Sequence, residues 1–510
     1  LGECIRIQGN YQEARQVYER LLQERGARQE HDTPAEAQRK AQIDALLWSE
    51  VGWTWYYTGD YAHTRQYCER GEEVLREARV VGGPAWARLY FQHSYILWQE
   101  GKYDEARQAA NEALRLFEEM LPKRQSPAGF DAPLTRMRRT LVGDPVDLAR
   151  THRLLGALAN SVGLLTEALT HFNTALAILE EHDHKREVAH VSCNVGYVHL
   201  QKAEHEQARP FLRRSLSLAE QIGDVPLTAV IYSNLGVLAG RTGDLQEAEN
   251  WLKRSLVLAE QTNDQVYLST WNAELAAVYL DQGRLESQVE AGMCIGRALM
   301  IGRAMRNDPC IGYALVALGN LRIVQARGAG EDEPRPYGDG DGQGWHGRRR
   351  YLARANKTLQ RALTFGRLEA GARSRGQLAL AQVNFLQGDI ERARMQALHA
   401  LKKARQYELI WLAARSLHLL GDILAAQGQK LQAYQHFEQA LQIFRACAMR
   451  LETARTLQSY ALVLLQEDED IETSHQRALG YLQEALQMCS DCHATLDQRR
   501  IEGILISRDA

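Results

Sequence analysis

Apolar residues recur along most of the chain at steps of three and four, the period of a helix with one buried face. In segment 227–264, a first apolar stripe is formed by Ile231, Leu235 and Leu238. A second stripe is formed by Leu245, Ala248, Leu252, Leu256 and Ala259. Thr242-Gly243-Asp244 interrupts the pattern between them. The segment therefore predicts two antiparallel helices joined by a tight turn, neither of which buries its apolar face alone.

This two-helix pattern repeats with a period of 40 residues. We take Gly236 as the marker where the first helix approaches the second most closely. Equivalent small residues are Gly156, Gly196, Ala276, Ala381, Gly421 and Ala461. Twelve residues after a marker, alanine recurs at Ala168, Ala208, Ala248, Ala393 and Ala433. The repeat predicts an all-α solenoid of about eleven helix hairpins, each covering its neighbour's apolar face.

The repeats resemble the tetratricopeptide repeat (TPR), whose Leu-Gly pair, turn glycine, alanine and large apolar residue match Leu235-Gly236, Gly243, Ala248 and Leu252. The same order recurs in 155–175 and 420–440. The repeat is longer than the common TPR unit of about 34 residues. It is therefore similar to long-repeat TPR arrays, such as kinesin light chains and sensor regions of bacterial signal-transducing ATPases of the MalT-like type. The resemblance implies a right-handed superhelix.

Two interruptions of the period divide the chain. We expect N-terminal repeats over 1–120, central repeats over 146–327 and C-terminal repeats with a cap over 351–510. An insert with prolines and arginines separates the first two groups at 121–145, and a flexible Gly/Asp-rich insert occupies 328–350. The first repeat is truncated, because Leu1-Gly2 matches the middle of a first helix. We therefore expect the natural chain to begin upstream.

Composition limits the function classes. The 510 residues are 45% hydrophobic with a formal net charge of −3, which excludes a generally basic nucleic-acid binder but not a local basic patch. No apolar run approaches the length of a membrane span. Eight cysteines in so long a chain do not indicate a disulfide framework, so we expect free thiols and a cytoplasmic protein.

The groove, meaning the concave face of the solenoid, is where a TPR array resembling this one would bind its ligands. The resemblance implies that the first helix of each hairpin lines it. The expected groove residues of the N-terminal repeats are aromatic: Trp53, Tyr56, Phe91, Tyr95 and Trp98. Those of the middle repeats are polar: Arg150, Arg153, Asn160, His190, Asn194, Tyr197 and Asn234. Aromatic and arginine side chains are also the usual anchors of binding hot spots.

Arginine occupies one groove position, six residues before the marker, in five repeats: Arg88, Arg150, Arg375, Arg415 and Arg455. Guanidinium groups spaced along a groove suit carboxylates or phosphates, which they grip in bidentate fashion. The alternative is that this position opens a helix, where any polar residue would serve. Sequence alone leaves both interpretations open.

Motifs for chemistry are weak. Cys489-Ser490-Asp491-Cys492-His493 has the spacing of covalent haem attachment, but no other feature indicates export or a haem pocket. The sequence contains no phosphate-binding glycine loop, nucleophile elbow or zinc-protease helix. We therefore expect no catalytic site, no cofactor and no metal in this chain.

These patterns favour a TPR module that binds a protein, a peptide or another ligand as the sensor or interaction region of a larger regulatory protein. The partner would be a protein or peptide of acidic or phosphorylated character, or a small-molecule effector, with neither a membrane nor nucleic acid expected. A permanent assembly scaffold is one alternative. Another is the regulatory arm of an enzyme, such as a caspase-like protease or an NTPase, whose catalytic domain lies outside this chain.

Overall fold

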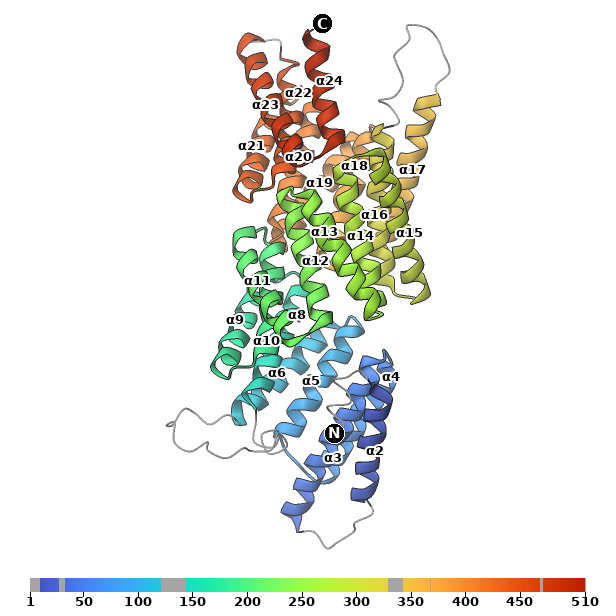
Figure 1. The fold of residues 1–510 in the computed structure, drawn as a ribbon, viewed down its shortest axis with the longest axis vertical. Coiled ribbons are helices and arrows are strands. Elements are labelled where there is room, and N and C mark those ends of the chain that lie inside the picture. Colours follow the sequence, from blue (N-terminus) through green and yellow to red (C-terminus); the bar gives the residue numbers. More distant parts are fainter. Residues whose placement is uncertain are drawn as a thin grey trace. The chain divides into compact units, whose positions relative to one another are not determined.

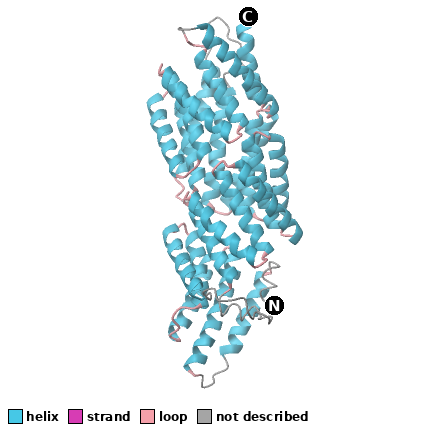
Figure 2. Cartoon of the chain, turned by 90° about the vertical axis from the view of Figure 1, so that its left-hand side faces the viewer, coloured by secondary structure: helices cyan, strands magenta, loops and turns pink. Residues whose placement is uncertain are grey.

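The computed structural model describes residues 10–26, 33–120, 144–328, 343–366, 368–467 and 471–509. Over these ranges the chain forms 22 helices and no strand (Figures 1 and 2). The prediction of an all-α solenoid built from TPR-like hairpins is confirmed. The chain divides into two compact units, Leu1–Asn160 with Thr166–Val191, and Ser161–Leu165 with Ser192–Ala510.

Unit 1 alternates first and second helices of successive hairpins. The first helices are α3 (Pro34–Tyr57), α5 (Pro84–Gln99), α8 (Pro145–Ser161) and the start of α10 (Lys185–Gln201). The second helices are α2 (Tyr11–Gly26), α4 (Tyr61–Glu77), α6 (Tyr103–Met120) and α9 (Leu165–Glu181). At the predicted start of α8, the Asp144 carboxylate accepts a hydrogen bond from Val146 N at 3.0 Å, and Pro145 is the first helical residue.

Unit 2 continues the alternation from the end of α10. Its other first helices are α12 (Val225–Thr242), α14 (Gln265–Gln282), α16 (Asp308–Gly328), α18 (Ala370–Leu386), α20 (Ile410–Ala426), α22 (Arg450–Leu464) and α24 (Thr495–Asp509). The second helices are α11 (His205–Ile222), α13 (Leu245–Gln261), α15 (Leu285–Ala304), α17 (Gln343–Leu363), α19 (Ile390–Gln406), α21 (Lys430–Ala446) and α23 (Ile471–Asp491). Neighbouring first helices also contact each other, as α14 contacts α16 and α16 contacts α18.

The marker glycines pack as the repeat predicts. A Cβ atom added to Gly236 would lie 2.7 Å from Leu252 Cγ, which comes from the second helix of the same hairpin. A Cβ atom on Gly156 would lie 2.7 Å from Phe172 Cε1, and one on Gly421 would lie 2.5 Å from Phe437 Cε1. In each hairpin a large apolar side chain therefore occupies the space that a marker side chain would need.

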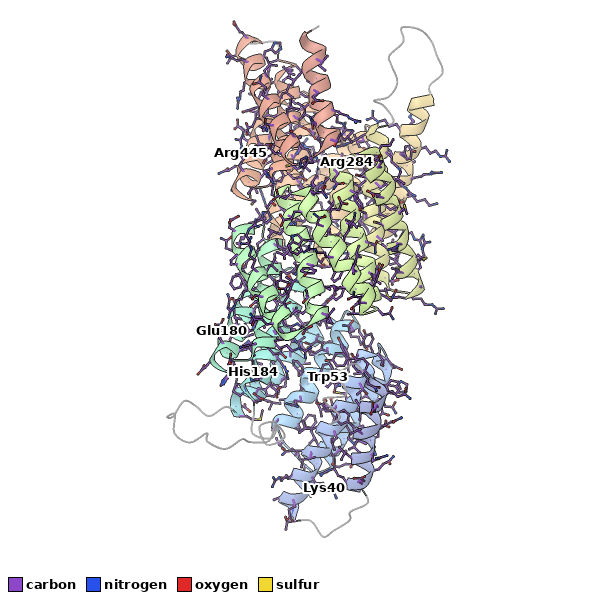
Figure 3. All side chains as sticks on the ribbon, in the orientation of Figure 1. Lys40, Trp53, Glu180, His184, Arg284 and Arg445 are labelled. Carbon is purple, nitrogen blue, oxygen red and sulfur yellow. The ribbon has the colours of Figure 1, made fainter. Side chains whose placement is uncertain are left out.

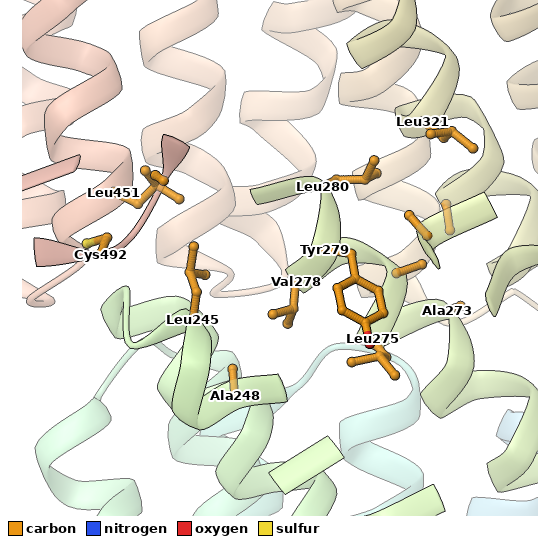
Figure 4. Packing of buried hydrophobic residues seen from close by; sticks show 14 of the residues in the cluster. Leu245, Ala248, Ala273, Leu275, Val278, Tyr279, Leu280, Leu321, Leu451 and Cys492 are labelled. Atoms are coloured by element: carbon orange, nitrogen blue, oxygen red, sulfur yellow. The ribbon is translucent and has the colours of Figure 1, made fainter. Parts of the chain in front are cut away.

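Unit 2 also contains contacts between hairpins far apart in sequence. Arg450, at the start of α22, donates from Nε to the carbonyl of Thr242 at 2.8 Å and forms an ion pair with Asp244 in the α12–α13 turn. His205 Nδ1 lies 2.7 Å from the carbonyl oxygen of Cys447, before α22. Figure 4 shows Leu451 and Cys492 beside Leu245, and all three belong to one apolar core. Successive turns of this solenoid therefore pack on one another.

The structure revises one predicted boundary. The second helix of the interrupted hairpin, α17, begins at Gln343, whereas the sequence placed its start at Tyr351. Residues 343–350 thus belong to a helix, and the remainder of that insert, 329–342, lies outside the described residues, as do 1–9 and 121–143. Among the described helices, none combines the length and apolarity that a membrane span requires.

Candidate functional site

The five predicted groove aromatics of unit 1 form one cluster. Trp53 and Tyr56 lie one turn apart on α3, and Phe91, Tyr95 and Trp98 lie one turn apart on the neighbouring first helix, α5. The ring of Trp53, labelled in Figure 3, has its centroid 5.3 Å from that of Tyr95 and 5.2 Å from that of Tyr56. Tyr95 in turn lies 5.2 Å from Phe91 and 5.9 Å from Trp98.

All five rings of this aromatic cluster are half-buried, so each presents part of its surface to solvent. The rings meet edge-on or tilted, the arrangements that aromatic quadrupoles favour. Burial raises the pKa of the Tyr95 hydroxyl, and the guanidinium of Arg153 lies close enough to oppose this rise. The cluster is therefore a partly exposed aromatic surface with arginine at one side.

The arginines of unit 1 are paired with carboxylates of the following hairpin. Arg88 Nη2 lies 2.6 Å from Asp147 Oδ2, and Arg150 Nη2 lies 2.8 Å from Glu187 Oε1. Arg153 Nε also approaches Glu187, at 3.9 Å. Burial would raise the pKa of Glu187, but Arg153 and Arg150 outweigh burial and lower it to about 2.

Arginine–carboxylate pairs between first helices also occur in unit 2, and we call the whole series the ion-pair ladder. Arg415 Nε lies 3.6 Å from Glu452 Oε1 of the next first helix. Arg455 contacts Asp497 at 2.8 Å on α24 and Asp281 at 2.9 Å on α14. Arg375 departs from the pattern, because the corresponding residue of the next hairpin is Leu412, and it pairs with Glu274 at 3.3 Å instead. The arginine row is thus held by acidic partners that the sequence analysis missed.

A spacing in the sequence could have identified these partners. Arg150 and Glu187, like Arg415 and Glu452, are 37 residues apart. Arg88 and Asp147 are 59 apart, because the first insert lies between them. In these three pairs, an arginine six residues before one marker meets an acid nine residues before the next.

The other predicted groove residues are dispersed. Asn160 and His190 are half-buried in unit 1. In unit 2 the buried Asn234 donates to Cys193 Sγ at 3.3 Å, and Tyr197 donates to Glu369 Oε1 at 3.4 Å. Asn194 is half-buried in the same part of α10. The structure therefore brings the aromatics and the arginine pairs into defined clusters, but not the polar residues between them.

Unit 2 holds a cavity of about 260 Å³ lined by six first helices, α14, α16, α18, α20, α22 and α24. We call it the inner cavity. Three of the predicted groove arginines, Arg375, Arg415 and Arg455, line it. The lining residues that sequence reasoning missed are Asp281, Asn320, Arg327, Gln382, His418, Asp422, Glu452, Gln458, Ser459, Asp497 and Arg500. The apolar part of the lining consists of leucine and alanine side chains with Ile323 and Val324.

Charges of both signs are close together in the inner cavity. Burial would raise the pKa of Glu452, but Arg415 and Arg455 outweigh burial and lower it. Burial raises the pKa of Asp281 although Arg455 opposes the rise. The pKa of Arg327 is lowered, first by burial and then by the positive charge of Arg500. The lining contains five arginines and four carboxylates, so a bound group would meet both donors and acceptors.

One group has the residue types of a metal site. Cys68, Glu72 and His93 place their ligand atoms within 4.8 Å of one another in unit 1. Glu72 also pairs with Arg76 and lies 3.8 Å from His93 Nδ1. Burial raises the pKa of the Cys68 thiol. Glu72 of this group has a cationic partner within the protein.

Comparison with protein-family models finds tetratricopeptide repeats. One tetratricopeptide-repeat model matches residues 147–221 and 187–261, and a second matches 87–119 and 414–447. No curated protein matches the chain.

Solved structures share the fold at low sequence identity. A Rap protein complexed with Competence and Sporulation Factor is 12% identical, with a TM-score of 0.55 over 78% of this chain and 94% of that chain. The apo form of RapI is 14% identical, with a TM-score of 0.50 over 79% of this chain and 96% of that one. Human IFIT1 with m7Gppp-AAAA is 15% identical, with a TM-score of 0.43 over 89% and 94% of the two chains.

The Rap structures support the solenoid fold, and the family models match parts of it within 87–119, 147–261 and 414–447. The packed marker glycines give these matches their physical basis. The chain therefore carries tetratricopeptide repeats within an all-α solenoid fold.

Proposed function

We propose that this protein binds an extended polypeptide segment in the inner cavity of unit 2 and acts as the sensor or interaction region of a larger regulatory protein. A TPR array of this kind is a binding module. The observation that carries the proposal is the cavity itself, because its lining comes from six successive first helices. A ligand lying along it can contact many hairpins, as an extended peptide does.

The chemistry of the lining favours a peptide over an apolar small molecule. A peptide backbone offers a donor and an acceptor at nearly every residue. Side-chain amides of Asn320, Gln382 and Gln458 can meet both, and Leu378 and Leu412 provide apolar contact. The lining could therefore hydrogen-bond to the main chain of a peptide and also contact its apolar side chains.

Charge favours an acidic or phosphorylated segment. Asp281, Glu452 and Asp497 are already engaged with Arg415 and Arg455. The positive charge of Arg500 disfavours the charged form of Arg327 and so helps to lower its pKa, after burial. An anionic group placed between them would relieve this repulsion and gain charge-assisted hydrogen bonds. In a structure of the same fold, a Rap protein is complexed with Competence and Sporulation Factor, a precedent for ligand binding.

Blocking the cavity tests the proposal. Peptides selected from a random display library for binding to the wild-type protein serve as probes. Gln382 is a half-buried residue of the cavity lining, and Gln382→Trp places a large side chain in the inner cavity. Gln435→Trp makes the same change on the exposed face of α21. We expect the first variant to weaken binding by roughly tenfold or more and the second to leave it unchanged. Equal affinity for both variants would place the peptide elsewhere and reject the proposal.

We propose the aromatic cluster of unit 1 as a second contact surface. Its half-buried rings offer large stacking areas at small entropic cost. Trp98→Ala is expected to weaken binding of a natural partner without changing the dependence of its affinity on salt, since stacking is not ionic. An unchanged affinity, measured with helicity intact, would assign the cluster to packing alone.

A further inference from the structure

The outward face of α15 exposes a continuous apolar stripe. Leu285, Val289, Met293 and Met300 are 80%, 62%, 71% and 64% exposed. They follow one another at steps of four and seven residues, so they lie on one side of the helix over its whole length. In Figure 1 this helix lies at the edge of unit 2. Large apolar side chains gathered in this way usually mark an interaction surface.

The other hairpins provide an internal control. Ala291 of α15, Ala248 of α13 and Ala208 of α11 are equivalent residues, each fully buried. Relative to the equivalent alanines, α19 and α21 have one apolar residue each, Met395 at the position of Met293 and Leu431 at that of Val289. In α13 and α11 both positions hold polar or imino residues: Gln246 and Asn250, and Glu206 and Pro210. Because all four of these are exposed, the solenoid itself does not require apolar residues there.

Beside the apolar stripe, α15 carries a negative charge before its midpoint and a positive charge after it. Glu290 and Arg297 are both exposed and lie at equal separations from the midpoint between Met293 and Cys294. Arg297 Nη1 lies 3.5 Å from Glu260 of α13, and both side chains are more than half exposed. Such a surface pair contributes little to stability and leaves Arg297 available to another carboxylate.

Small residues at the centre allow close approach. A Cβ atom added to Gly296 would meet nothing within 4 Å, and one added to Gly292 would lie 3.8 Å from Leu321 Cδ2. The middle of the stripe is therefore uncovered at Gly296, which leaves room there for a side chain from another helix.

We propose that the α15 face binds the α15 face of a second copy of this chain, with the two helices antiparallel about a two-fold axis near Met293. Antiparallel pairing places Glu290 of each copy beside Arg297 of the other, so each ion pair forms twice. The same pairing sets Val289 near Met300 of the second copy and Met293 near Gly296. The face is thus complementary to itself in apolar character and, at the two Glu290–Arg297 pairs, in charge.

The first test is the oligomeric state of the full chain, measured by sedimentation equilibrium over the micromolar range. Wild type is expected to dimerise. Met293→Glu should raise the dissociation constant roughly tenfold or more, because it buries a charge in the apolar stripe. Met395→Glu makes the same change at a 68% exposed methionine on α19 and should leave the dimer intact. Circular dichroism confirms that both variants keep their helices.

Charge exchange tests the antiparallel arrangement. Glu290→Arg alone sets two arginines against each other at both ends of the interface, and Arg297→Glu alone does the same with two glutamates. Each variant alone is expected to dimerise more weakly than wild type. An equimolar mixture of the two restores both ion pairs and should form a heterodimer. A wild type that is monomeric throughout, a dimer insensitive to Met293→Glu, or a mixture no stronger than its components would overturn the proposal.

Discussion

Gly236 and Gly240 lie one turn apart in α12 and meet different surroundings. A Cβ atom on Gly236 would overlap Leu252 and lie 3.3 Å from the carbonyl oxygen of Ala248. A Cβ atom on Gly240 would have its nearest neighbours at 3.7 Å, an ordinary van der Waals distance. Helix propensity favours alanine equally at both positions, so the difference between them isolates packing.

Gly236→Ala should therefore lower the free energy of unfolding by about 1–3 kcal/mol through overpacking, whereas Gly240→Ala should raise it by up to about 1 kcal/mol. Urea denaturation of the two variants measures both effects. Hydrogen exchange should place the loss in the hairpins next to α12, because damage in a repeat array stays partly local. A uniform loss of protection across all hairpins would contradict the repeat account.

Protonation of the buried His205 should make the stability of the folded protein depend on pH. Burial first, and then the positive charge of Arg241, lower its pKa to about 4 from an ordinary value of 6.5, although the carbonyl of Cys447 opposes the change. The folded protein therefore binds the proton more weakly than the unfolded chain does. The stability from neutral His205 is complete above pH 6.5 and is lost as the pH falls toward 4.

The prediction is that His205→Gln, whose side-chain amide can still donate to Cys447, flattens the pH dependence of unfolding between pH 6.5 and 4. It should not abolish that dependence, because the pKa of His152 is also lowered to about 4, by burial and by His171. Denaturation curves at successive pH values provide the comparison. An unchanged slope in the variant would show that His205 is accessible to protons in the folded state.

Turns between paired helices differ according to what they contact. Gly243 and Gly388 end the first helices of their hairpins with positive φ angles of 93° and 85°. A Cβ atom at Gly243 would lie 2.6 Å from Cys492 Sγ, whereas one at Gly388 would meet nothing within 4 Å. Of these two turns, the one at Gly243 contacts a distant hairpin of unit 2 and the one at Gly388 does not.

Alanine should therefore be more costly at Gly243 than at Gly388. Both substitutions incur the strain of a left-handed residue, about 1 kcal/mol. Gly243→Ala must also displace the turn that carries Cys492, so we expect an additional loss of about 1–2 kcal/mol. Melting temperatures of the two variants give the difference directly. Equal destabilisation would mean that the contact between successive turns adds no stability.

The ion-pair ladder connects first helices of different hairpins. Glu187→Gln leaves Arg150 and Arg153 close together without their carboxylate, and we expect it to cost about 2 kcal/mol. Solvent limits the effect, because the Arg150 side chain remains 32% exposed. A double-mutant cycle with Arg150→Met measures the pair, and additive losses would show that the ladder is not cooperative.

The sequence was sufficient for features that depend on one hairpin and its neighbour. The hairpin period and the marker glycines follow from spacing, and the ladder could have been found in the same way. The aromatic residues were selected from the resemblance to TPR arrays. The contacts of Gly243 with Cys492 and of His205 with Cys447 could not, because they depend on how far the solenoid curls. That curvature is a small rotation added over many hairpins, and no local pattern encodes it.

At the scale of the molecule, two faces of unit 2 have different chemistry. The first helices line the inner cavity with paired charges, and α15 presents an apolar stripe outward. A ligand in the cavity would contact several hairpins at once, so its binding would couple their stabilities. This coupling is how we expect a ligand to act on regions of the protein beyond the cavity.

The central claim is that the first helices of unit 2 form the binding surface. Hydrogen exchange with and without a bound peptide, read helix by helix, tests it most directly. The account predicts increased protection in α16, α18, α20 and α22, with α13, α15, α19 and α21 nearly unchanged. Protection confined to the second helices, with the first helices unaffected, would contradict it.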